Sequence, residues 1–207
     1  MKFLERLRNT EENIERALKE IHDCELNALI HMAADFIKGY VGVDIYKDLD
    51  IKFGVAPMPI TEDEDSWSMC KGCYNKAKKE LVLNAFMSQL PNRQLEILFT
   101  VTHELIHAIQ MQLGIGRYKN INYNKLDELE KLIEVDYYDL TSEIDARIGE
   151  LNLLKFLEDK DIFIDLDFKH NVIKHTFEYK DINRFENYLF DVNDKYVLDK
   201  ASKYLYK

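Results

Sequence analysis

Apolar positions recur at helical spacing near the start of this chain. Residues 10–38 carry an apolar stripe with a period near 3.6, made of Ile14, Leu18, Ile21, Ala28 and Phe36. Thr10 stands where an N-cap is favoured, and acidic residues follow it in the first turn. The pattern therefore predicts one long helix that Gly39 ends.

After this helical segment, the apolar residues recur at the two-residue spacing of β-strands. Apolar and polar residues alternate over 43–46 and 50–55, which predicts two strands, and an acidic loop covers 61–66. Residues 67–74 and 79–84 predict a hairpin around the polar segment between them. This region therefore indicates a small, mostly antiparallel sheet.

Helical spacing returns in the second half. A mostly apolar stretch runs from Pro91, which suits the first turn of a helix, to Gly114, which suits its C-terminal cap. Further helices are expected at 125–135, 143–157, 182–189 and 195–206.

These elements predict an α+β fold in which the small sheet packs on the helix after Pro91 and the C-terminal part is helical. The length suits one domain over residues 1–207, because no segment reads as a linker. Within it we expect an N-terminal helix, a sheet, a pair of central helices and a helical extension, at 1–40, 41–90, 91–157 and 158–207.

The net charge and the hydropathy of the chain disfavour two classes of binding partner, nucleic acids and membranes. The net charge of −10 disfavours direct binding to nucleic acid, whose phosphates require clusters of Lys and Arg. The sequence has no apolar run long enough to span a membrane, and residues 1–20 lack the apolar centre of a signal peptide. We therefore expect a cytoplasmic protein with no membrane partner.

Three cysteines agree with a reducing compartment. Cys24 falls on the apolar face of the first helix and is interpreted as a small core residue. Cys70 and Cys73 form a Cys-x-x-Cys pair. No second Cys or His pair lies nearby to complete a zinc ribbon, so the segment is interpreted as a turn between strands, with a redox pair as the alternative.

The chemistry of the chain centres on His103, Glu104 and His107, which form a His-Glu-x-x-His box in the apolar helix. Histidines at i and i+4 share one helix face, so both can bind one zinc ion. Glu104 projects to the side and can accept a proton from a water molecule at the metal. Chance matches to this pattern occur, but burial of three such groups is costly unless a metal pairs with them.

A catalytic zinc takes three protein ligands, so a further one is required. Glu143 is the first candidate because Thr141 or Ser142 can cap a helix and place it in the first turn. Asp145 and, more weakly, Asp139 are rivals. The alternative is that these acids merely interact with the helix dipole.

Catalysis also needs a donor for the developing oxyanion. Four residues are candidates, and the sequence does not rank them: Tyr137, Tyr138, His170 and His175. For the two histidines a surface position is the favoured interpretation.

Several segments together resemble the ImmA/IrrE-type zinc metallopeptidases. They are Gly72–Asn75, the strand Glu80–Asn84, Phe99–His107 and Glu143–Ala146, in this order. The resemblance implies a zincin-like, gluzincin fold, one Zn²⁺ held by His103, His107 and Glu143, and hydrolysis of a protein substrate. In this family the substrate is often a repressor of a phage or mobile element.

In zincin folds an extended substrate can pair with an edge strand beside the active-site helix. Residues 81–84 are our candidate, with a plain edge strand as the alternative. Two other functions stay open: a regulatory protein that keeps zinc without cleaving, and a different zinc hydrolase such as an amidase. A protein or peptide partner is expected in each case, and the sequence leaves the oligomeric state open.

Overall fold

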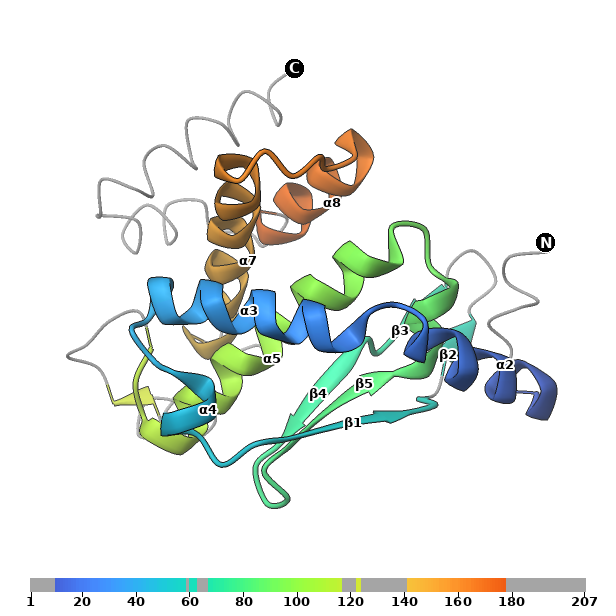
Figure 1. Ribbon diagram of the computed structural model, residues 1–207, viewed down its shortest axis with the longest axis horizontal. Helices are drawn as coiled ribbons and strands as arrows, with labels where there is room; N and C mark the ends of the chain where they lie inside the picture. Colours follow the sequence, from blue (N-terminus) through green and yellow to red (C-terminus); the bar gives the residue numbers. More distant parts are fainter. Residues whose placement is uncertain (1–9, 59, 63–66, 117–121, 124–140, 178–207) are drawn as a thin grey trace. The chain divides into compact units, whose positions relative to one another are not determined.

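The computed structural model describes residues 10–58, 60–62, 67–116, 122–123 and 141–177. The chain divides into two compact units, Met1–Ile121 and Asn122–Lys207, and each is described by itself. The first combines helices with a small sheet, whereas the described part of the second is helical (Figure 1). The predicted α+β class is therefore confirmed, and the single domain stays a prediction.

Two helices replace the long N-terminal helix that the stripe predicted. α2 spans Glu11–His22 and α3 spans Leu26–Tyr40. Thr10 caps α2 as expected, since its side chain accepts a hydrogen bond from the Asn13 N–H at 3.3 Å. The prediction of one helix is wrong because Glu25 adopts a left-handed φ of 54°, which breaks the backbone ladder while the apolar stripe resumes beyond it.

The strand predicted at 43–46 is also wrong. A short helix, α4, occupies Ile45–Asp48 instead. The Asp44 carbonyl accepts from the N–H groups of Lys47 and Asp48 at 3.0 and 2.8 Å, while the Asp48 side chain accepts from the Asp44 N–H at 2.8 Å. These local bonds close a turn that competes with strand pairing.

The main sheet has the order β1-β5-β4. The central strand β5 is Glu80–Asn84, and its neighbours are β1, Lys52–Ala56, and β4, Gly72–Asn75. β1 runs parallel to β5 and β4 runs antiparallel to it, so the sheet is mixed rather than mostly antiparallel. A separate antiparallel pair joins β2, Ile60–Glu62, to β3, Trp67–Met69.

The β4–β5 hairpin confirms the predicted one in part: Gly72–Asn75 pairs with β5, whereas Trp67–Met69, predicted in the same strand, pairs with β2 instead. The edge position predicted for residues 81–84 is wrong. β5 is paired on both sides, so its backbone groups are already used and no substrate strand can add there. Its buried side chains, Leu81 and Leu83, explain the central place, because they fill the core beneath the helices.

A long helix, α5, covers the sheet. After a 3₁₀ turn η1 at Ala85–Gln89, α5 spans Arg93–Leu113. It packs against α3, β4 and β5, as the green helix of Figure 1 shows. Gly114 ends it at a φ of 67°, which confirms the predicted cap, whereas Pro91 precedes the N-cap Asn92 instead of lying in the first turn. The apolar face of α5 is therefore turned to the core of the first unit.

The described part of the second unit consists of α7, Thr141–Asp159, and α8, Leu166–Phe177, which pack against each other. α7 confirms the helix predicted at 143–157. The helices predicted at 125–135, 182–189 and 195–206 lie outside the described residues. No helix in the described ranges is both long and apolar enough to cross a bilayer.

Candidate metal centre

Helix α5 brings two imidazoles together. The Nε2 atoms of His103 and His107 lie 3.0 Å apart, and their rings are 4.7 Å apart between centroids at 76°. Two nitrogens that bind one zinc at tetrahedral angles are separated by about 3.3 Å. The predicted pair therefore has the spacing that a shared metal ion requires.

The orientation of His107 is fixed by Gln110, a residue that the sequence reasoning missed. Nδ1 of His107 lies 2.9 Å from the Gln110 side-chain oxygen, and both residues are buried. With the amide oxygen as the acceptor, Nδ1 is the donor, and in this tautomer Nε2 has a free lone pair. Such a partner at i+3 orients a metal-binding histidine, and the spacing alone could have suggested it.

Glu104 lies between the two histidines in sequence and is partly exposed. Its charge acts on the two thiols of the Cys-x-x-Cys segment. Burial raises the pKa of both thiols, and the negative charge of Glu104 raises it further. A carboxylate beside the histidine pair, yet with access to solvent, is suited to exchange protons with water.

Glu143 is the carboxylate candidate for the third ligand. Among the described residues, it is grouped with His103 and His107 as side chains that could hold a metal ion. Glu143 lies in the first turn of α7 and is buried. The rival Asp145 is buried on the same helix but is not in this group, and Asp139 lies outside the described residues.

Two nitrogens and one carboxylate oxygen form the donor set that catalytic zinc sites use. Two of these three groups, His107 and Glu143, are buried polar side chains, and a cation would offset the burial of the carboxylate. The residues present therefore fit a divalent metal ion.

Of the four candidate oxyanion donors, the structure describes the side chain of His170. Tyr137 and Tyr138 lie outside the described residues, and the side chain of His175 is not described. His170 is exposed on α8, in agreement with the surface position favoured for it.

Both interpretations of the cysteines hold. Cys24 is buried and donates to the Glu20 carbonyl at 3.3 Å, as expected for a small core residue, and burial raises the pKa of its thiol. Cys70 lies between β3 and β4, and Cys73 lies within β4. Cys70 and Lys71 therefore form the connection between strands that the sequence predicted, whereas Gly72 and Cys73 already belong to β4.

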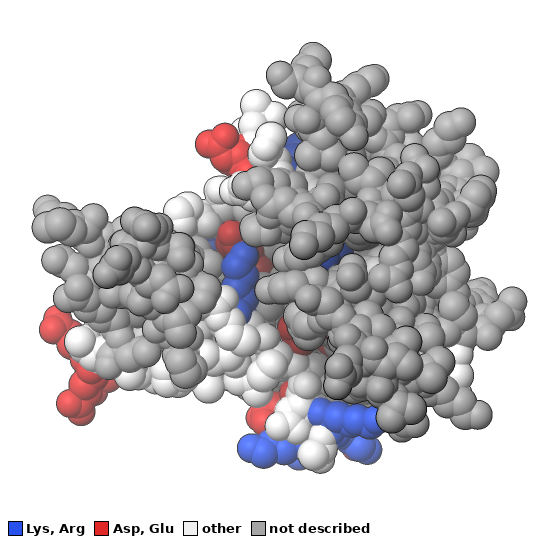
Figure 2. Space-filling model, turned by 180° about the vertical axis from the view of Figure 1, so that it is seen from behind, with Lys and Arg blue, Asp and Glu red and all other residues white. Residues whose placement is uncertain are grey.

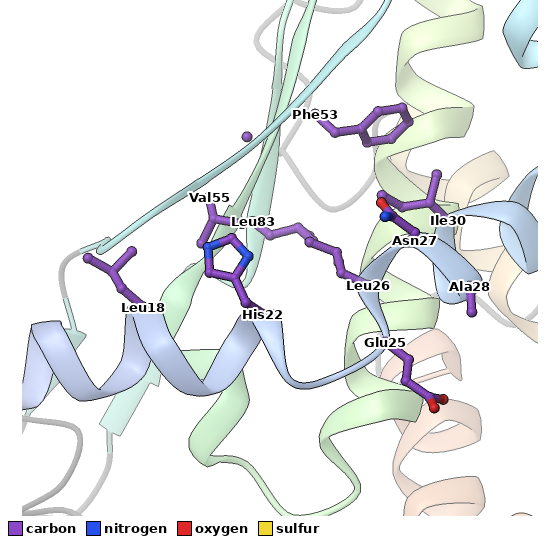
Figure 3. A pocket seen from close by; sticks show the side chains of 11 residues that line it. Leu18, His22, Glu25, Leu26, Asn27, Ala28, Ile30, Phe53, Val55 and Leu83 are labelled. Carbon is purple, nitrogen blue, oxygen red and sulfur yellow. The ribbon is translucent and has the colours of Figure 1, made fainter.

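A cavity of about 700 Å³ lies elsewhere in the first unit. Leu18 and His22 of α2 line it from one side, and Phe53, Val55 and Leu83 of the sheet line it from the other (Figure 3). None of the histidine box residues lines it. We place the candidate site at His103 because the cavity has no comparable set of metal-binding groups.

Acidic and basic side chains of the described residues adjoin in the centre and at the lower edge of the face drawn in Figure 2, while other acidic groups lie apart from them. Ion pairs such as Lys38–Asp44 and Lys79–Asp50, both at 2.9 Å, are examples in the first unit. Each pair lowers the pKa of its aspartate and raises that of its lysine.

No family model matches this chain, and neither a curated protein nor a solved structure does. The resemblance to ImmA/IrrE-type peptidases therefore depends on the motifs alone, and what it implies about function stays a prediction.

Proposed function

We propose that this protein is a zinc-dependent peptidase of zincin-like architecture whose substrate is a protein or peptide. One observation carries the proposal: two imidazole Nε2 atoms face each other at 3.0 Å on α5 while the Nδ1 of one is held by Gln110. That arrangement brings the two nitrogens close enough to bind one ion. Glu104, the residue between them in the box, supplies the base that a purely structural site would not need.

In the proposed mechanism, His103, His107 and Glu143 hold the metal. When bound, zinc polarises the scissile carbonyl and lowers the pKa of water toward about 7. Glu104 accepts the proton of the attacking water and then donates it to the leaving amine. His107, oriented by Gln110, keeps its lone pair directed at the site throughout.

The base is tested by Glu104→Gln in the full chain. We expect zinc to stay near one equivalent per chain while hydrolysis of denatured casein falls by about 10²–10⁴-fold, the usual effect of losing a general base. Glu96→Gln is the matched control, because it makes the same change on the same helix two turns earlier. Full activity of Glu104→Gln would remove this residue from the mechanism.

The third ligand is tested by Glu143→Gln against Asp145→Asn. Both residues are buried near the start of α7, so the two variants carry a similar structural cost. We expect zinc affinity to fall in Glu143→Gln and to stay close to the wild-type value in Asp145→Asn. The opposite result would assign the ligand to Asp145.

The wild-type protein separates the remaining functions. Bound zinc without cleavage of casein or of short peptides would favour the regulatory protein that keeps zinc. Cleavage of a non-peptide amide alone would favour an amidase. Cleavage of an intact repressor, tested with candidates of the phage or mobile-element type, would support the narrower substrate prediction.

A further inference from the structure

The proposed mechanism does not use the Cys70–Cys73 pair. Both residues are exposed and reduced. The Cys70 thiol donates to the Gly72 carbonyl at 3.3 Å, two residues ahead. Two residues of an extended strand span roughly 6.6 Å, so the chain must bend here to bring the sulfur back. The Cys70 sulfur therefore lies against the peptide group that joins Gly72 to Cys73.

This bend is held firmly from the strand side. The Asn84 side-chain amide donates to the Cys70 carbonyl at 2.8 Å, and the Asn84 N–H donates to the Lys71 carbonyl at 2.9 Å. Asn84 is fully buried at the end of β5. The position of the two thiols is therefore set by the sheet and not by a loose loop.

The same bend lies along one stripe of α5. Lys71 pairs with Glu96 at 2.7 Å, and a Cβ added to Gly72 would lie 2.8 Å from the Thr100 Cγ2 atom. Glu96, Thr100 and Glu104 are spaced by four residues, so they share one helix face. The bend thus follows this face towards Glu104, and the Glu104 charge affects both thiols.

We propose that Cys70 and Cys73 form a reversible disulfide in the presence of hydrogen peroxide, and that this bond regulates the Glu104 site. The regulatory part rests on the proposed function. One thiolate attacks a peroxide oxygen, giving a sulfenic acid and releasing water after protonation. The second thiolate then attacks the sulfenic sulfur, forming the S–S bond and releasing a second water. Two thiols are oxidised and one peroxide is reduced.

The bond has a direct structural consequence. The Cys70 sulfur must leave the Gly72 carbonyl and approach the Cys73 sulfur, with the two Cα atoms within roughly 4.4–6.8 Å. Gly72 has no free space against Thr100, so the bend cannot change without shifting its contacts on α5. Glu104 lies one helical turn beyond Thr100, and this places the change beside the proposed base.

The disulfide is tested on the full-length chain, treated with hydrogen peroxide and then with dithiothreitol. We expect peroxide to lower the mass of the intact protein by two hydrogen atoms. Digestion should then yield a peptide linked through Cys70 and Cys73, and dithiothreitol should reverse both changes. Cys70→Ser and Cys73→Ser should abolish the linked peptide, and Cys24→Ser should retain it. Absence of the linked peptide in wild type, or linkage through Cys24, would overturn the proposal.

Hydrolysis of casein is measured on the same samples. We expect a several-fold lower rate for the oxidised wild type, recovery after reduction, and no loss for peroxide-treated Cys70→Ser. A linked peptide with an unchanged rate would overturn the regulatory part. If no form hydrolyses casein but the linked peptide appears, the proposed function fails while the disulfide site stands.

Discussion

Substitution of Gly72 by alanine tests the contact that fixes β4 on the histidine-bearing helix. A Cβ at this position would lie 2.8 Å from the Thr100 Cγ2 atom, 3.2 Å from the Val82 carbonyl oxygen and 3.4 Å from a Leu83 methyl. The first distance is a clash with a buried side chain, and overpacking of this kind costs about 1–3 kcal/mol.

A second effect opposes the clash. Gly72 lies in a strand and has no positive φ, so alanine can adopt its backbone conformation. Because alanine has less conformational freedom than glycine in the unfolded chain, the substitution also stabilises the folded state by about 0.4–1 kcal/mol. We expect Gly72→Ala to lower the free energy of unfolding by about 1–2 kcal/mol, measured by urea denaturation.

A companion variant identifies the clashing atom. Thr100→Ser removes the Cγ2 methyl and should cost about 1 kcal/mol alone. In the double variant the alanine methyl occupies the vacated space, so the combined loss should be smaller than the sum of the two single losses by about 1 kcal/mol.

Gly39 provides a control of opposite sign. It lies inside α3, and a Cβ there would meet nothing within 4 Å. Gly39→Ala should therefore stabilise the protein by about 0.5–1 kcal/mol. If Gly72→Ala is as stable as wild type, or if its effect simply adds to that of Thr100→Ser, the close packing of β4 on α5 is refuted.

Three further predictions concern the metal and the thiols. Gln110→Leu should weaken zinc binding by about 10–100-fold, because His107 loses the side chain that orients it. Competition with a chelating dye measures this affinity. An unchanged affinity would show that Gln110 does not orient His107 for metal binding. Removal of zinc with a chelator should lower the melting temperature, since an ion present at 100 times its Kd adds about 2.7 kcal/mol to the stability of the folded protein. An identical melting curve would argue against a zinc site in the folded protein. Glu104→Gln removes a negative charge that raises the pKa of Cys70 and Cys73. Below that pKa, the fraction of each thiol present as thiolate should increase, and with it the rate of alkylation by iodoacetamide. The alkylation rate of Cys24, whose pKa does not depend on Glu104, should stay constant. Equal rates before and after the substitution would show that Glu104 does not influence the pair.

Where local signals agreed with burial, the sequence predicted the fold well. Thr10 caps α2, Gly114 ends α5, and the hairpin of β4 and β5 turns where polar residues interrupt two strands. The box on α5 follows from helix periodicity alone, because residues four apart necessarily share a face.

The errors arose where a local pattern has two outcomes. An apolar stripe continues in phase across Glu25, so it does not reveal that the backbone turns left-handed there. Alternation over 43–46 fits a strand, but Asp44 and Asp48 close a helical turn with their own hydrogen bonds. A short apolar strand such as β5 has the same sequence pattern at an edge or in the centre of a sheet. Its pattern does not reveal how many strands pair with it, because β1 is distant in sequence.

The sequence by itself determined the helix that carries the two imidazoles and Glu104, since that relationship spans a single turn. It also determined which acidic residues were available as ligands. Tertiary structure alone decided that β5 lies between β1 and β4, and that Gly72, beside Cys70, packs against Thr100 of α5. The physical reason is that side-chain rotamers and long-range packing, which no spacing rule encodes, set these distances.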